Sequence, residues 1–196
     1  MKNNRTWKKL NILAAIGLIS VICMAAIPAQ MAYAATTTVT VVAPEQVNPD
    51  EQFSVSVEVT PGTQIAGVQL YLSFTPSVVK IDSIAEGNLL SQNGASTYLY
   101  KGAIDNSAGT VSGIIGAIIT PGESVSTAGT FVTVSMTAVG SGTAYITLSS
   151  VVVGDINGQP VPVTVTNDQT IVGSTDGGVV GGWVAYCSRI SLSLAH

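Results

Sequence analysis

The carboxylates are the side chains of this sequence that could perform acid–base chemistry, because residues 37–172 contain no histidine and no cysteine. That absence excludes Ser-His-Asp and Cys-His catalysis and typical zinc sites from this segment. A glycosidase needs two carboxylates across a cleft, and Asp82 with Glu86, or Asp105 with Asp155, are the pairs that could be proposed. No aromatic-rich sugar subsite accompanies either pair. We therefore predict a protein that is not an enzyme, whose dispersed acids form a solvated surface.

A calcium site is the second chemistry to consider, because Asp155-Ile156-Asn157-Gly158 resembles the start of an EF-hand loop. Such a loop needs an acidic fifth residue, glycine at the sixth and glutamate at the twelfth, where this sequence has Gln159, Pro160 and Thr166. Asn-Gly is also the strongest short hairpin signal. The sequence therefore predicts a hairpin turn here, and no metal or cofactor of the protein's own.

Four tyrosines fall in stretches that are predicted to be strands, namely Tyr71, Tyr98, Tyr100 and Tyr145. An exposed tyrosine on a strand combines a large contact area with a hydroxyl group, so it suits the binding of a protein or a sugar. The alternative is that these tyrosines cap the edge of a β-sandwich. The residues alone leave both interpretations open.

The elements that position these residues are predicted to be strands throughout. Residues 67–74 alternate Val68, Leu70, Leu72 and Phe74 with polar side chains, which is typical of a strand with one buried face. Similar runs, separated by Gly, Pro, Asn and Asp turns, predict an all-β fold: a nine-stranded antiparallel β-sandwich with jelly-roll topology. The nine predicted strands span residues 38–42, 53–59, 67–74, 78–84, 97–104, 110–119, 129–138, 143–153 and 161–172.

The two ends of the chain are predicted to lie outside this domain. Residues 1–34 have a basic start, an apolar stretch and the small-residue site Ala32-Tyr33-Ala34, which together indicate a cleaved signal peptide. An uncleaved membrane anchor is the alternative. Residues 173–196 are predicted to be a Gly-rich linker and a short irregular tail, too interrupted to span a membrane. We therefore expect a mature protein that is secreted, extracellular or on the cell surface, with no membrane span.

Charge and cysteine content limit the partners further. Removal of residues 1–34 leaves three basic residues against eleven acidic ones, a net charge of −8. Nucleic-acid binding requires clustered Lys and Arg, so we exclude it. Only Cys187 remains after that removal, so no intramolecular disulfide can form and the fold must be stabilised by its core.

Four landmarks occur in the order that is seen in a known family: VNPDEQFSVSVEV, AGVQLYLSFTPSVVKIDSI, AGTFVTVSMTA and GTAYITLSSVVVGDINGQPVPV. Between residues 37 and 172 the sequence resembles cohesin domains, the receptor modules that bind dockerin-bearing proteins. The resemblance implies a nine-stranded jelly-roll sandwich without catalytic activity. It also implies a dockerin-type extracellular partner, in polysaccharide degradation or cell-surface attachment, with any calcium held by the dockerin.

The resemblance further implies a binding face on the sheet of the third, fifth, sixth and eighth predicted strands. The residues carried over to it are Gln69, Tyr71, Tyr98 or Tyr100, Ile115, and Tyr145 or Thr147; Ile114 is the alternative to Ile115. Many cohesins have an acidic residue near Gln69 that helps to orient the dockerin. Glutamine can still form hydrogen bonds, but this departure from the family pattern puts ordinary dockerin specificity in doubt. A carbohydrate-binding or structural surface-layer or adhesion module is the alternative function, although residues 37–172 contain no tryptophan.

Overall fold

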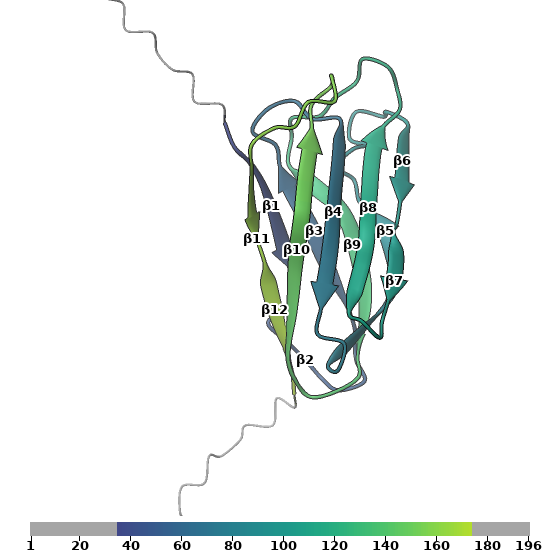
Figure 1. The fold of residues 1–196 in the computed structure, drawn as a ribbon, viewed down its shortest axis with the longest axis vertical. Coiled ribbons are helices and arrows are strands. Elements are labelled where there is room, and N and C mark those ends of the chain that lie inside the picture. Colours follow the sequence, from purple (N-terminus) through teal and green to yellow (C-terminus); the bar gives the residue numbers. More distant parts are fainter. Residues whose placement is uncertain (1–34, 174–196) are drawn as a thin grey trace, which may run out of the picture. The chain divides into compact units, whose positions relative to one another are not determined.

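Apolar side chains at alternate positions give each long strand one buried face, and these faces pack two β-sheets against each other (Figure 1). The computed structural model describes residues 35–173, in which no helix occurs. Its strands are β1 (Thr37–Val42), β2 (Gln46–Val47), β3 (Gln52–Thr60), β4 (Gly67–Phe74), β5 (Val79–Glu86), β6 (Thr97–Tyr100), β7 (Ala103–Asp105), β8 (Thr110–Ile118), β9 (Gly129–Ala138), β10 (Gly142–Gly154), β11 (Val163–Thr166) and β12 (Asp168–Val172).

The two sheets differ in size. The five-stranded sheet has the order β11-β1-β3-β9-β5, and the seven-stranded sheet has the order β2-β12-β10-β4-β8-β6, with β7 also paired to β8. In Figure 1 the strands β10, β4 and β8 lie side by side at the front, so β4 is a central strand of its sheet. The predicted all-β sandwich of two sheets is confirmed.

The core lies between the sheets and is built from β-branched and aliphatic side chains, with Phe131 its largest fully buried residue. Glycine at position 116 makes room for that ring. A Cβ atom on Gly116 would stand 2.4 Å from a carbon of Phe131, so any larger residue would collide with it. The backbone of β8 therefore approaches the core closely at this point.

The predicted count of nine strands is wrong, because three features escape local periodicity. The two-residue strand β2 is too short to show alternation. The predicted strand 97–104 is interrupted at Gly102, whose φ of 74° is a left-handed conformation that ends β6 before β7 begins. The predicted strand 161–172 is interrupted at Asn167, between β11 and β12.

The predicted antiparallel arrangement is also incomplete, because both sheets are mixed. β11 pairs in parallel with β1 in one sheet, and β12 pairs in parallel with β2 in the other. The chain thus crosses from sheet to sheet at Asn167, where the side-chain Oδ1 accepts a hydrogen bond of 2.8 Å from the Leu148 N–H. Two parallel strands are connected by a long stretch of chain, so the local sequence pattern does not predict that they pair.

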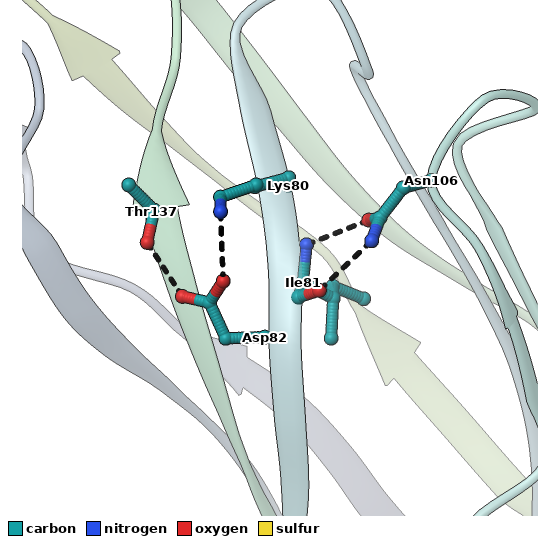
Figure 2. Close-up of polar contacts among 5 residues, drawn as sticks. All are labelled: Lys80, Ile81, Asp82, Asn106 and Thr137. Carbon is teal, nitrogen blue, oxygen red and sulfur yellow. Dashed lines mark hydrogen bonds and ion pairs between the residues drawn. The ribbon is translucent and has the colours of Figure 1, made fainter.

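β5 is an edge strand of the five-stranded sheet. Its backbone is covered by the side chain of Asn106, which lies in the turn between β7 and β8 of the other sheet. Figure 2 shows the amide of Asn106 facing the backbone of Ile81. The Ile81 N–H donates to Asn106 Oδ1 at 2.8 Å, and Asn106 Nδ2 donates to the Ile81 carbonyl at 2.9 Å. One amide thus satisfies both backbone groups, as a residue of a neighbouring strand would.

Charged side chains protect the same edge strand. Asp82 Oδ2 accepts a hydrogen bond of 2.5 Å from Thr137 Oγ1, and Asp82 Oδ1 lies 3.3 Å from Lys80 Nζ (Figure 2). The Thr137 hydroxyl, with Lys80 as a further cause, lowers the pKa of Asp82. Charge on an edge strand disfavours pairing with another chain.

Candidate partner-binding face

The outer side of the seven-stranded sheet carries most of the residues that the sequence analysis singled out. Side chains that point away from the core on β4, β6, β8 and β10 form what we call the tyrosine face. It comprises Gln69, Tyr71, Tyr98, Tyr100, Ile115, Tyr145, Thr147 and Val152. Tyr98, Tyr100 and Tyr145 are each about half exposed, at 56%, 48% and 57%.

A β-bulge in β8 decides which isoleucine reaches this face. Gly113 has a φ of 64°, and the pairing register with β4 shifts there, between Leu70 and Leu72. As a result Val111 and Ile114 are both buried although they are three residues apart, and Ile115 is 38% exposed. The ambiguity between Ile114 and Ile115 is thereby resolved: Ile115 lies on the tyrosine face.

A second bulge, in β10, adds a residue that the sequence analysis missed. Ser150 has a φ of 48°, and the register with β4 shifts between Ser149 and Val152. Val153 is fully buried and Val152 is 46% exposed, the reverse of what alternation from Ile146 would predict. The Ser149-Ser150 pair inside an apolar run is the only trace of this bulge in the sequence.

The two bulges align four outward side chains in one row across the sheet. Gln69 is the register partner of Val152 on β10 and of Ile115 on β8. Ile115 is in turn the partner of Tyr100 on β6. Side chains directly opposite each other on neighbouring strands are in contact range, so this row forms one surface.

The adjacent row consists of small residues and ends at a tyrosine. Gly67 pairs with Gly154 on one side and with Ala117 on the other, and Ala117 pairs with Tyr98. The absence of side chains at the two glycines leaves a shallow hollow of about 200 Å³. Its lining consists of Gly67, Val68, Gln69, Ile115, Gly116, Ala117, Val152 and Gly154.

Two of the candidate residues lie at the opposite end of the face. Tyr145 stands beside Thr75, whose Oγ1 accepts a hydrogen bond of 3.0 Å from the Tyr145 N–H, just beyond the end of β4. Five residues of strand separate Phe74 from Gln69, about 17 Å. Thr147 Oγ1 lies 2.8 Å from Ser73 Oγ, so this hydroxyl is already hydrogen-bonded within the domain. The structure therefore brings Gln69, Ile115 and Tyr100 together but places Tyr145 away from them.

The tyrosine face carries no charge on its three central strands. β4, β8 and β10 contain no Asp, Glu, Lys or Arg. The outer side of the five-stranded sheet is different, because its strands present Thr and Ser side chains together with Glu58 and the Lys80–Asp82 pair. The two faces of the sandwich are thus chemically distinct.

The carboxylates do not form a catalytic pair at Asp105 and Asp155. Asp105 pairs with Thr110 at the start of β8, and Asp155 follows Gly154 at the other end of the sheet. Each carboxylate is hydrogen-bonded within its own turn. The Ser107 hydroxyl lowers the pKa of Asp105, and the Gln159 N–H lowers that of Asp155.

The predicted turn at Asp155–Gly158 is confirmed. The Gly158 N–H donates to the Asp155 carbonyl at 3.0 Å, and Gly158 has a φ of 74°. Asp155 Oδ1 accepts from the N–H groups of Asn157 and Gln159, each at 2.8 Å. Within residues 35–173, no three His, Cys, Asp or Glu side chains are grouped so that they could hold a metal ion. This part of the chain also contains no helix long and apolar enough to cross a membrane.

Solved structures with the same fold are cohesins. One is the non-cellulosomal cohesin from the hyperthermophilic archaeon Archaeoglobus fulgidus, with 19% identity, 72% of this chain and 94% of that chain covered, and a TM-score of 0.55. Another is a type I cohesin–dockerin complex from Clostridium thermocellum, with 14% identity, coverage of 70% and 99%, and a TM-score of 0.59. A third is the cohesin module of a family 33 glycoside hydrolase from Clostridium perfringens, with 13% identity, coverage of 71% and 98%, and a TM-score of 0.58.

A search of curated proteins finds no relative of this sequence. The family model of the cohesin domain, however, matches residues 37–172, which are nearly all of the residues that the structure describes. Cohesins are binding modules rather than enzymes. Over residues 37–172, the chain belongs to the cohesin domain family.

Proposed function

We propose that this protein is a secreted, non-catalytic receptor that binds the dockerin module of a partner protein through the tyrosine face. The observation that carries the proposal is the contrast between the two outer faces. One is rich in Ser, Thr and charge, and the other exposes tyrosines and aliphatic side chains without charge on β4, β8 and β10. Depletion of charge and enrichment in aromatic residues are typical of the core of a protein–protein interface.

The comparisons support a dockerin as the partner. Structural relatives include a cohesin from Acetivibrio cellulolyticus in complex with the Cel5 dockerin and the Clostridium thermocellum cohesin in complex with the dockerin Doc918. The proposal includes a signal peptide at residues 1–34, which would carry the domain out of the cell, and a linker with a tail at residues 173–196. Residues 1–34 and 174–196 lie outside the described residues.

The proposal is tested by binding measurements on the immobilised protein. A panel of recombinant dockerin modules, including Cel5 and Doc918, is passed over it first with calcium and then with a chelator. We expect at least one calcium-dependent complex, because the calcium belongs to the dockerin. Retention on insoluble glycans with no dockerin bound would overturn the proposal in favour of a carbohydrate-binding module.

Variants then locate the interface. Gln69→Arg combined with Tyr71→Ala should abolish the complex, because it places a charge in the uncharged face and removes an aromatic contact. Ser54→Arg is the matched control, since Ser54 is exposed on the outer side of the five-stranded sheet. Equal loss in the control, or no loss in the double variant, would rule out the tyrosine face as the site.

A further inference from the structure

The hollow beside Gln69 exists because two outward-facing positions on neighbouring strands are glycines. Gly67 and Gly154 are register partners, and neither contributes a side chain to the surface. A Cβ atom on Gly154 would meet no atom within 4 Å, and one on Gly67 would meet only the Gly116 carbonyl oxygen, at 3.4 Å. Neither glycine has a left-handed φ, so the backbone does not require glycine at either position. The hollow therefore exists because Gly67 and Gly154 have no side chains.

The walls of the hollow define what it can hold. Val152 and Ile115 line it from either side, and each is exposed to solvent, at 46% and 38%. Gln69 is the only polar side chain in the lining, and the three strands that build it carry no charge. An ionic or strongly polar group would therefore lose its hydration here without gaining a partner.

The volume limits the size of the occupant. About 200 Å³ is below the roughly 300–1,000 Å³ of sites that enclose a small-molecule ligand. A cavity of roughly 150 Å³ can hold a molecule the size of benzene. The hollow is thus suited to a single apolar side chain that projects from a larger partner.

We propose that this hollow is a socket on the cohesin surface that takes one aliphatic side chain, Leu, Ile or Met, from the dockerin. The inference rests on the proposed function and refines it, because it names the partner group that the face selects. A side chain that fills the socket would cover exposed parts of Val152 and Ile115 and displace the water above the glycine backbone. An apolar side chain that loses its hydration in a well-packed pocket is the type of contact that dominates the binding energy of an interface.

The glycines offer a direct test, because a side chain can be added without disturbing the domain. Gly154→Val and Gly154→Leu would fill the socket from within, into open space. Valine is β-branched and therefore favoured in a strand, so the melting temperature of Gly154→Val should not fall. Gly173→Val is the matched control, since a Cβ atom there also meets nothing within 4 Å and Gly173 lies past the end of β12, at the other end of the sheet.

The measurement is the Kd of the wild type and these variants for the dockerin that binds most tightly in the panel. We expect both Gly154 variants to weaken binding by at least about tenfold, with Gly173→Val unchanged. Each exposed aliphatic residue of that dockerin is then changed to Ala. One of these changes should weaken binding to the wild type and have little further effect on Gly154→Val, because the two substitutions remove the same contact.

The outcomes separate the two proposals. If the wild type binds a dockerin and Gly154→Val binds it equally well, the socket is refuted and the proposed function stands. The socket is also refuted if the change in binding free energy caused by Gly154→Val adds to that of every dockerin substitution, because two substitutions that remove the same contact should not be additive. If the wild type binds no dockerin in the panel, the proposed function fails, and the socket fails with it.

Discussion

Ile115 lies directly opposite Gln69 across the β4–β8 pairing, with its side chain on the solvent side of the sheet. This relationship depends on the bulge at Gly113, which turns Ile114 into the core and its neighbour outward. A similar bulge in β10 exposes Val152 on the other side of Gln69. Two irregularities thus concentrate exposed aliphatic surface around one central glutamine.

The bulge predicts opposite consequences for two adjacent isoleucines. Ile114→Ala should lower the free energy of unfolding by about 2–5 kcal/mol, because it leaves a cavity at a fully buried position. Ile115→Ala should change it by less than about 0.5 kcal/mol but weaken dockerin binding, because that side chain is exposed. Urea unfolding and titration of the dockerin on both variants check this. Similar stability losses in the two variants would contradict the bulged register.

The amide of Asn106 is expected to contribute to stability rather than to binding. Asn106→Ala leaves the N–H and C=O of Ile81 without their partners, so we expect a loss of about 1–3 kcal/mol in the free energy of unfolding. Asn93→Ala is the control, because the Asn93 amide bonds the Ser124 carbonyl at an exposed position, where a loss below about 0.5 kcal/mol is expected. Equal effects in the two variants would show that the edge of β5 does not depend on Asn106.

If the proposed dockerin complex forms through the tyrosine face, its dissociation should be nearly independent of salt. Raising the ionic strength from about 0.1 M to about 1 M shortens the Debye length from about 10 Å to about 3 Å. Charges at the rim would respond mainly through the association rate, and the uncharged strands β4, β8 and β10 offer no ion pair to weaken. We expect the dissociation rate constant, measured by surface plasmon resonance, to change by less than about threefold. A rise of tenfold or more, about 1.4 kcal/mol, would mean that ion pairs hold the complex.

The turn after β10 should make a contribution to stability that acid removes. The Gln159 N–H holds the pKa of Asp155 below the ordinary aspartate value of 3.8. The contribution is therefore fully present above pH 3.8 and is lost as the pH falls through the pKa of the folded state. Asp155→Ala should therefore lower the melting temperature at neutral pH. The difference from the wild type should shrink as the pH is lowered below about 4. Thermal unfolding followed by circular dichroism gives the melting temperatures of the wild type and of Asp155→Ala at each pH. A difference between them that does not vary with pH would contradict a stabilising role of the Asp155 carboxylate.

Much of the architecture could be read from local sequence. The alternation in β3 and β4, and the turn at Asn157-Gly158, depend on interactions between near neighbours, which the residue pattern records directly. The all-β class, the two sheets and the placement of Gln69 and Tyr71 on the outer side follow from that alternation. The cohesin landmarks added the family, because their order along the chain is itself a property of the sequence.

The tertiary structure decided what depends on distant partners. The division of residues 161–172 between two sheets required strands β1 and β10, which lie far away along the chain. The exposure of Ile115 and Val152 required bulges whose left-handed residues, Gly113 and Ser150, are ordinary in sequence and special only in conformation. Because one extra residue reverses the facing of every side chain after it, local alternation cannot predict the outer surface beyond such a point. The hollow between Gly67 and Gly154 follows for the same reason, since only the register of two separate strands makes these glycines neighbours.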